Sequence, residues 1–414
     1  ILQSTVMSLR EWYAKREILL TGVTSELGRN LLEKILRSFP DVKVHLILRS
    51  RDGINYLERV KNIFASPGYE RLRQEDPEAI SRVSIWEGNL VYDDLALSDA
   101  DKAKMKNISV VFHAGGPHDA IFQFCEELPN FEALAAVSSI FKHKGQINEH
   151  LQNERTPNIA LALVRVALLG PPFREPIPGH VEILKGPAAF MVGAGYVQGR
   201  ADKPAELTPI DIVSNTLIAT AWERLRCVDT DCSNSRGTPM VYNASTVECT
   251  WGDLIAKGHR AARKFPYPMF GIRGITSIAW LYWIVVLLLE WLPSVLCDTI
   301  VGLCGGKQRV LREHEKARKA LKSLESIAWR SWSAERNRVQ FLQQRLSPED
   351  QEAFPLQVEI DIENYILSTA AAARKRCIDE KVITLVRNFR YLFFTFASLF
   401  LIYSLLYVKS ILVN

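Results

Sequence analysis

The arrangement of residues 17–50 restricts the fold of this chain more than any other feature. An apolar run at residues 17–21 (EILLT) is followed by a glycine-containing turn at residues 22–28 (GVTSELG), by leucine and isoleucine at helical spacing, and by a second apolar run at residues 42–48 (VKVHLIL). A strand, a glycine turn, a helix and a second strand in this order open a doubly wound α/β sheet, which binds a dinucleotide at the carboxyl ends of its strands. We therefore predict a parallel Rossmann-type sheet over residues 16–244.

The glycine turn has the chemistry of a pyrophosphate site, with one departure. Gly22 makes the tight turn, Gly28 lets the helix pack closely on the strand, and the first amides of the helix face the anion. The position of closest backbone approach is occupied by Ser25, and Glu26 follows it. Because a carboxylate near a pyrophosphate is electrostatically unfavourable, this pair weakens the match to a dinucleotide turn.

The end of the second predicted strand indicates which dinucleotide is bound. It carries Arg49, where an enzyme specific for NAD would carry a carboxylate. A guanidinium there fits a 2′-phosphate, so we predict NADPH as the cofactor, and a solvated loop arginine is the alternative. Two further predicted strands, at residues 83–86 and 108–113, are each followed by small residues that suit a loop beside the adenosine. The predicted cofactor-binding residues are Thr21, Gly22, Thr24, Leu27, Gly28, Arg49, Asn89, Leu90 and Ala114.

The positive charge is concentrated in the carboxyl-terminal third of the chain. Of the net charge of +5, residues 307–345 contribute +7 and residues 373–390 contribute +4, so the rest of the chain is acidic. Each basic block adjoins an apolar segment, which favours anionic lipid headgroups over nucleic acid as the partner. Residues 391–408 are 18 residues without a charge, long enough for a transmembrane helix. The basic residues before this segment predict a single span with the main domain in the cytosol, and a buried helix of a soluble core is the alternative.

A second apolar stretch, at residues 275–304, is rich in tryptophan and tyrosine. It is interrupted by Glu290, Pro293 and Asp298. We predict a broken or re-entrant membrane-associated hairpin, with a buried helical pair as the alternative. This stretch would belong to a helical carboxyl-terminal domain over residues 245–370.

The cysteines and histidines do not predict a metal site. Seven cysteines occur without any Cys-x-x-Cys pair, so we predict free thiols in a reducing compartment. His113, His118 and His143 fall near the predicted cleft, but their spacing does not match a set of metal ligands.

A set of short motifs follows in a fixed order along nearly the whole chain. They are TGVTSELG (21–28), LILRS (46–50), EGNL (87–90), VFHAGG (111–116), LVRVALLG (163–170), REPIPGH (174–180), KGPAAF (185–190), LTPIDIVSN (207–215), VYNAS (241–245), TWGDL (250–254) and RLSPEDQEAF (345–354). In this order they resemble the eukaryotic fatty acyl-CoA reductases, which are extended short-chain dehydrogenases with a helical carboxyl-terminal domain. The resemblance implies NADPH-dependent reduction of long-chain acyl-CoA to a primary fatty alcohol. It also implies acyl-CoA and membrane lipids as partners, and an endoplasmic reticulum or peroxisomal membrane as the location.

The resemblance also implies a Tyr-x-x-x-Lys pair, and the chain departs from the family at this point. None of the twelve tyrosines has a lysine four residues later, and the segment 117–163 is shorter than the family needs. We predict a helix over residues 140–151. If Lys144 is aligned with the family lysine, Ile140 takes the tyrosine position, and Ser139 would orient the carbonyl.

Three hypotheses follow from these observations. The first is an active membrane-bound reductase. The second is a non-catalytic relative that still binds acyl-CoA, the membrane or a protein partner, as the missing tyrosine and the altered glycine turn favour. The third is that a stretch of the natural protein is absent from this sequence.

Overall fold

The computed structural model describes most of the chain. The described residues are 7–142, 146–147, 159–182, 184, 186–192, 195–229, 239–244, 249–266, 270, 272–377 and 380–413. The chain divides into two compact units, each assembled from three segments. The first unit contains Ile1–Pro178, Glu206–Val247 and Trp332–Ile360, and the second contains Gly179–Ala205, Glu248–Ser331 and Asp361–Asn414.

This interleaving differs from the single boundary that we predicted between residues 244 and 245. The segment Trp332–Ile360 returns to the first unit because it buries apolar side chains in the core on the sheet. Leu342 and Phe354 belong to this core and are 0% and 3% exposed, respectively. Burying these apolar side chains stabilises the first unit. A division of the chain into two continuous domains would leave them without this core.

A seven-stranded parallel sheet lies at the centre of the first unit. Its strands are β1 (Glu17–Thr21), β2 (Lys43–Leu48), β3 (Val83–Glu87), β4 (Ile108–His113), β5 (Ala133–Ser139), β7 (Leu161–Val166) and β11 (Met240–Ala244). Their order is β11-β7-β5-β4-β1-β2-β3, and every neighbouring pair is parallel. Chain order reverses between β1 and β4, which is the point where a doubly wound sheet binds its ligand. The predicted doubly wound Rossmann-type sheet is confirmed.

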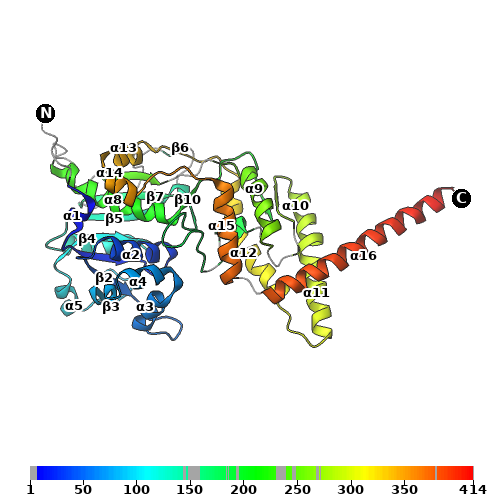
Figure 1. The fold of residues 1–414 in the computed structure, drawn as a ribbon, viewed down its shortest axis with the longest axis horizontal. Helices are drawn as coiled ribbons and strands as arrows, with labels where there is room; N and C mark the ends of the chain where they lie inside the picture. The colour runs from blue at the N-terminus through cyan, green and yellow to red at the C-terminus, as the bar shows by residue number, and fades with distance from the viewer. Residues whose placement is uncertain are drawn as a thin grey trace. The chain divides into compact units, whose positions relative to one another are not determined.

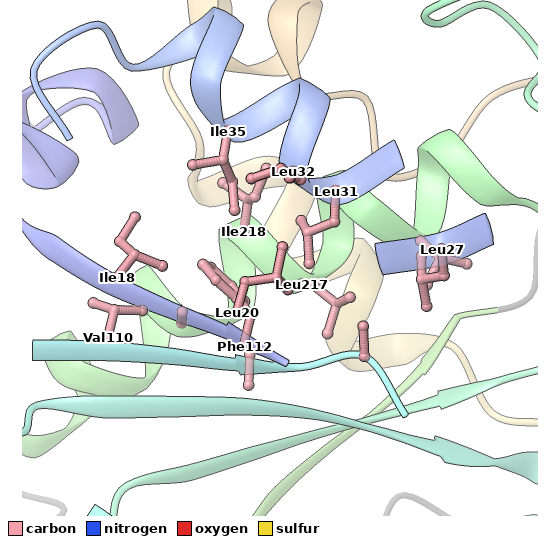
Figure 2. Close-up of a cluster of buried hydrophobic side chains, with 14 of the residues drawn as sticks. Ile18, Leu20, Leu27, Leu31, Leu32, Ile35, Val110, Phe112, Leu217 and Ile218 are labelled. Carbon is pink, nitrogen blue, oxygen red and sulfur yellow. The ribbon is translucent and has the colours of Figure 1, made fainter. Parts of the chain in front are cut away.

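Helices cover both faces of this sheet (Figure 1). They are α1 (Leu9–Tyr13), α2 (Glu26–Ser38), α3 (Tyr56–Ala65), α4 (Glu70–Glu75), α5 (Asp99–Lys104), α6 (Asp119–Glu127), α8 (Ile210–Asp229), α13 (Asn337–Arg345) and α14 (Pro348–Ala353). Strand side chains alternate between the faces, as the pleat requires. Figure 2 shows Ile18 and Leu20 of β1 meeting side chains of α2 and α8, whereas Leu19 faces the opposite core.

Shorter parallel pairs complete the strands. They are β6 (Gln146–Ile147) with β13 (Ser333–Ala334), β8 (Leu168–Gly170) with β10 (Leu207–Pro209), and β9 (Tyr196–Gln198) with β12 (Gly274–Thr276). The first pair contradicts the helix predicted over residues 140–151. Residues Ile140–Lys142 form a 3₁₀ turn instead, and the backbone of Gln146 and Ile147 finds its partner in a distant strand. Tertiary pairing here overrides the local helical pattern.

The second unit is mainly helical. Its helices are α7 (Gly186–Met191), α9 (Trp251–Lys264), α10 (Ala279–Val285), α11 (Leu292–Leu303), α12 (Val310–Ala328), α15 (Ile362–Cys377) and α16 (Glu380–Val413). A π-helical turn, Val286–Trp291, joins α10 to α11. Among the described residues, two helices, Ala279–Leu303 and Glu380–Ser404, are long and apolar enough to cross a membrane. This confirms only that the region contains apolar helices of sufficient length.

The hairpin predicted over residues 275–304 is wrong, because the chain does not reverse there. Residues Ala279–Leu303 form one helix, and we call it the 279–303 helix. Pro293 lies in the first turn of α11, directly after the π-helical turn, where its missing N–H is tolerated. Glu290 does not interrupt the helix either, since its carboxylate accepts a hydrogen bond from the amide of Tyr196 at 2.7 Å.

A carboxylate between two helices ties the loop after β8 to α2 and α4. Glu175 forms ion pairs with Lys34 and Arg37 of α2, and with Arg71 of α4. The Arg37 Nη2–Glu175 Oε2 distance is 3.1 Å, and the Arg71 Nη1–Glu175 Oε1 distance is 2.9 Å. Burial favours a raised pKa for Glu175, but Lys34 and Arg37 lower it from 4.5 to about 2. The ionised form therefore stabilises the folded state.

We expect the variant Glu175→Gln to lower the free energy of unfolding by roughly 2 kcal/mol at neutral pH, since charged hydrogen bonds are lost. Stability from Glu175 is present above its unfolded pKa of 4.5 and is lost as pH falls toward its folded pKa of about 2. The unfolding midpoint of the natural chain should therefore fall in this pH range, and that of the variant should fall less. Unfolding followed by tryptophan fluorescence at several pH values measures both effects.

The matched control is Glu75→Gln, because Glu75 forms only a half-exposed pair with Arg71. Such surface pairs contribute about 0.5 kcal/mol or less. Equal losses in the two variants would contradict the assigned role of Glu175.

Candidate dinucleotide site

A pocket of about 210 Å³ opens at the carboxyl ends of β1 and β2 and in the loops that follow β3 and β4. Its lining residues come from the ends of four neighbouring strands and from α3. They are Gly22, Val23, Thr24, Ile47, Leu48, Arg49, Arg51, Arg59, Gly88, Asn89, Leu90, Val91 and Gly115. Five of the nine predicted cofactor residues are among them: Gly22, Thr24, Arg49, Asn89 and Leu90.

Two glycines are required by the geometry of the turn. Gly22 has φ +77°, and a Cβ there would lie 3.0 Å from the backbone of Ala114 and Gly115. A Cβ on Gly28 would lie 2.3 Å from the carbonyl oxygen of Gly22. The first glycine therefore allows the turn, and the second allows α2 to approach β1.

Ser25 does not need the conformational freedom of a glycine. Its backbone is extended, with φ −78° and ψ 159°, and it is the N-cap of α2. The Ser25 hydroxyl accepts a hydrogen bond from the amide of Gly28 at 3.0 Å and donates to the carbonyl of Gly22 at 2.8 Å. The side chain thus takes up an amide that would otherwise be available to a phosphate oxygen at the helix N-terminus.

Three arginines line the same pocket, and we call Arg49, Arg51 and Arg59 the arginine cluster. Arg59, on α3, donates from Nη1 to the carbonyl of Arg49 at 2.5 Å. Burial and the neighbouring Arg51 and Arg49 lower the pKa of Arg59. Like charges held this close attract an anion, and a phosphomonoester fits several guanidinium groups at once.

The sequence pattern identified Arg49 but missed Arg51 and Arg59. Arg51 lies only two residues beyond the predicted strand end, so its proximity could have been inferred. Arg59 enters the pocket from a helix, and only the path of the loop between β2 and α3 brings it there.

Thr21, Leu27 and Ala114, which were also predicted to bind the cofactor, do not line the pocket and instead lie buried next to the turn. Thr21 is fully buried, and its hydroxyl lies 2.7 Å from Nδ1 of His113. Leu27 packs in the core, and Ala114 lies beneath Gly22.

His113 is a structural residue that links β1 and β4. Its Nε2 lies 3.3 Å from the carbonyl of Gly116, which assigns the proton to that nitrogen. Burial, together with the nearby His118, lowers the pKa of His113 to about 4. The imidazole is therefore neutral at physiological pH.

The end of β5 is the predicted catalytic position. The Ser139 hydroxyl accepts a hydrogen bond from the amide of Phe141 at 3.2 Å. Ile140, which takes the tyrosine position if Lys144 is aligned with the family lysine, is fully buried. Ser138 was not predicted, but its hydroxyl is buried and makes no hydrogen bond with the described residues. Lys144 and His143 lie outside the described residues.

Within the described part of the chain, no three histidine, cysteine, aspartate or glutamate side chains gather as metal ligands do. Five cysteines in this part, Cys125, Cys249, Cys297, Cys304 and Cys377, are free thiols.

Comparison with known families finds matches at both ends of the chain. A family model described as male sterility protein, with NAD-binding character, matches residues 20–128. A second model of the same description matches residues 289–380. Together the two matches span the nucleotide-binding end of the sheet and much of the helical second unit.

Curated relatives align along nearly the whole chain. Fatty acyl-CoA reductase 1 of Mus musculus is 25% identical, over 94% of this chain and 92% of the relative. Fatty acyl-CoA reductase 2 of Bos taurus is 24% identical over 96% and 93%, and fatty acyl-CoA reductase wat of Drosophila melanogaster is 23% identical over 84% and 81%. The mouse alignment occupies 482 positions, more than the 414 residues of this chain, so the relative has residues without a counterpart here.

Solved structures share the fold. The reductase domain of a nonribosomal peptide synthetase from Mycobacterium tuberculosis aligns with a TM-score of 0.56 and 14% identity, over 93% of this chain and 97% of that domain. The terminal R domain of the myxalamid pathway aligns with a TM-score of 0.54 and 15% identity, over 89% and 92%. At such identities the likeness concerns the fold alone.

We expect Ser25→Gly to tighten the binding of a nicotinamide dinucleotide about fivefold, because the amide of Gly28 becomes free and one such hydrogen bond contributes about 1 kcal/mol. Replacing a serine N-cap by glycine changes stability by only a few tenths of a kcal/mol. Nucleotide fluorescence on titration measures the affinity. Ser25→Ala, which also frees the amide but keeps a Cβ, is the matched variant. Unchanged or weaker binding by Ser25→Gly would show that the serine does not compete with the pyrophosphate.

Proposed function

Because the chain belongs to the fatty acyl-CoA reductase family, we propose that it reduces long-chain fatty acyl-CoA with NADPH to a primary alcohol and free CoA. NADPH, when bound, supplies hydride to the acyl carbonyl, first to release the thiol of CoA and leave an aldehyde, and then to convert the aldehyde to the alcohol. Each turnover consumes two NADPH and two protons. The arginine cluster in the pocket is the observation that carries this proposal.

The preference for NADPH over NADH is proposed from the charges in the pocket. Arg49 directly follows β2, at the position where an acidic residue would bind the ribose of NADH. Arg51 and Arg59 add two further cations around the same space. A 2′-phosphate would neutralise charges that now repel one another, and the hydroxyl of NADH would not.

The proposed orientation of the substrate carbonyl rests on the Ser139 hydroxyl at the end of β5. Ser139 uses its oxygen to accept from the Phe141 amide, which leaves its hydroxyl hydrogen to donate to a carbonyl oxygen. Donors aimed at the oxygen stabilise the negative charge that develops there during hydride addition.

One observation favours a second candidate function, a non-catalytic relative that binds acyl-CoA or a protein partner at the membrane. If Lys144 is aligned with the family lysine, Ile140 takes the tyrosine position, and its fully buried side chain neither donates nor accepts a proton. The residue at that position would then not supply the proton for the developing alkoxide.

The membrane part of the proposal rests on α16. This helix is 34 residues long, and its side chains from Tyr391 onward include large apolar residues that are mostly exposed. We propose that residues 391–408 cross the membrane once, with the main body of the protein on the cytosolic side, where the basic residues before the span would remain. An endoplasmic reticulum or peroxisomal membrane is proposed by analogy with the family.

We expect Arg49→Gln to weaken NADPH binding on the order of tenfold to a hundredfold, since a charge-assisted hydrogen bond contributes about 1.5–3 kcal/mol. NADH has no 2′-phosphate, so its affinity should be unchanged. Titration of the purified variant with both nucleotides gives the ratio. An equal loss for the two nucleotides would place Arg49 elsewhere than at the 2′-phosphate.

Turnover separates the two candidate functions. We expect the purified chain to oxidise NADPH in the presence of palmitoyl-CoA and to form hexadecanol, and Ser139→Ala to lower this rate on the order of a hundredfold. Absorbance and product extraction follow the reaction. A version carrying a family-length segment in place of residues 117–163 is the positive reference. NADPH binding without product in the unaltered chain would support the non-catalytic relative.

A further inference from the structure

The 279–303 helix has an unusual distribution of side chains around its axis. On its buried side, every fourth residue belongs to a stripe of largely polar side chains. They are Tyr282, Val286, Glu290, Ser294 and Asp298, each at most 9% exposed. Pro293 and Cys297 are also buried, beside this stripe. The helix therefore buries a mainly polar stripe within the protein, whereas helices of water-soluble proteins commonly bury an apolar one.

The buried stripe is fixed to the second unit by specific hydrogen bonds. Glu290 is fully buried, accepts from the Tyr196 amide, and lies 3.6 Å from Nη1 of Arg318. A Cβ on Gly195 would lie 3.0 Å from Oε1 of Glu290, so the backbone there passes directly over the carboxylate. Ser294 donates to the carbonyl of Glu290 at 2.6 Å.

Asp298 joins the 279–303 helix to the next helix. Its carboxylate accepts hydrogen bonds from the amides of Arg309, Val310 and Leu311 at 3.2, 3.1 and 2.9 Å. These amides are at the beginning of α12, so Asp298 caps that helix from outside. Because both carboxylates have their partners in the protein, this side of the helix cannot face lipid.

The helix α12 also prevents insertion of the pair across a bilayer. It packs against α11, and all but one of its described exposed positions are charged. The charged ones are Arg312, Glu315, Lys316, Lys319 and Lys322, and Ser326 is the exception. Charged side chains on a helix in the hydrocarbon core are costly, and two adjacent helices share one depth.

The opposite side of the 279–303 helix is apolar and exposed, and we call it the outward face. Its members are Trp280, Trp283, Ile284, Leu287, Leu288, Trp291, Leu296, Ile300 and Leu303, each at least 39% exposed. Tryptophan favours the level of the lipid headgroups, where the ring is apolar and its N–H stays wet. A contiguous exposed patch of this kind marks an interaction surface.

The outward face is continuous with the segment that we propose to cross the membrane. Val382 and Val386, near the start of α16, pack with Cys297 of α11 in one apolar cluster. The long helix α16 then extends away from this contact, as Figure 1 shows. A span that begins beside α11 brings the outward face to the surface of the same bilayer.

We propose that the 279–303 helix lies flat in the cytosolic leaflet, with its outward face in the lipid and its polar stripe on the protein, and that it does not cross the membrane. The partner is a lipid surface, and the exposed lysines of α12 favour an anionic one. This inference rests on the membrane part of the proposed function and not on the reaction.

Labelling from one side of the membrane tests the orientation. In sealed microsomes that contain the full chain, a charged maleimide that does not cross the membrane is added from the cytosolic side, and peptide mass spectrometry reads each cysteine. The two ends of the helix are reported by native Cys304, which is exposed, and by Ser277→Cys, also at an exposed position. We expect both to react equally without detergent. Reaction at one end only would mean that the helix spans the bilayer and would overturn the proposal.

A fluorescent probe tests whether lipid covers the outward face. Leu288→Cys, in a chain without other cysteines, is labelled with nitrobenzoxadiazole and reconstituted in vesicles of phosphatidylcholine and phosphatidylserine. We expect loss of fluorescence with doxyl-labelled lipids and little loss with aqueous iodide. Ile80→Cys, at a comparably exposed position of the first unit (44% against 47%), should show the reverse.

Quenching of the Leu288 probe by iodide, or by neither agent, would overturn the proposal, since water or a protein partner would then cover the face. A glycosylation acceptor added after Asn414 reports the span of α16 separately. If that acceptor stays unmodified, the single-span part of the proposed function fails, while the two measurements on the 279–303 helix still decide its own position.

Discussion

The close approach of α2 to the turn after β1 is the contact on which the nucleotide-binding unit depends. Only a hydrogen on the Cα of Gly28 leaves room for the carbonyl oxygen of Gly22, since a Cβ would lie 2.3 Å away. This spacing lets α2 bury its apolar face on the sheet and directs its N-terminus to the carboxyl edge of the sheet, where chain order reverses between β1 and β4. The pocket and its arginine cluster follow from that geometry. Ser25 is compatible with the same backbone but changes which groups are free to bind an anion.

Buried carboxylates serve different purposes in the two units. In the first unit, Glu175 holds a loop against α2 and α4 through three cations. In the second, Glu290 and Asp298 hold an apolar helix by its polar side, so that its tryptophans and leucines remain outside. A carboxylate that interrupts a hydrophobic sequence therefore does not end the helix. It determines which side of the helix faces the protein.

Much of the sheet could be predicted from the sequence because its signals are local. Apolar runs of strand length and a glycine turn specify β1 to β4 within one residue. The errors concern contacts between distant segments. Gln146 and Ile147 pair with residues almost two hundred positions later, which no local pattern reveals. The helical interpretation of residues 140–151 failed for this reason.

In the candidate site, too, the sequence predicted the residues whose signals are local and missed those that depend on distant contacts. Residues of the glycine turn and of strand ends were found from their spacing, whereas Arg59 depends on the course of a loop and Ser138 on the burial of one hydroxyl. For the 279–303 helix, composition indicated a membrane but not the side that faces it. That side is set by partners in β9 and α12, which lie outside the helix.

The interleaved units also determine when the protein can fold during synthesis. The sheet unit needs Leu342 and Phe354 to complete its core, so it stays incomplete until the ribosome has produced most of the chain. Domains that are continuous in sequence can fold one after another as they emerge, but this chain returns to the first unit after much of the second has been made.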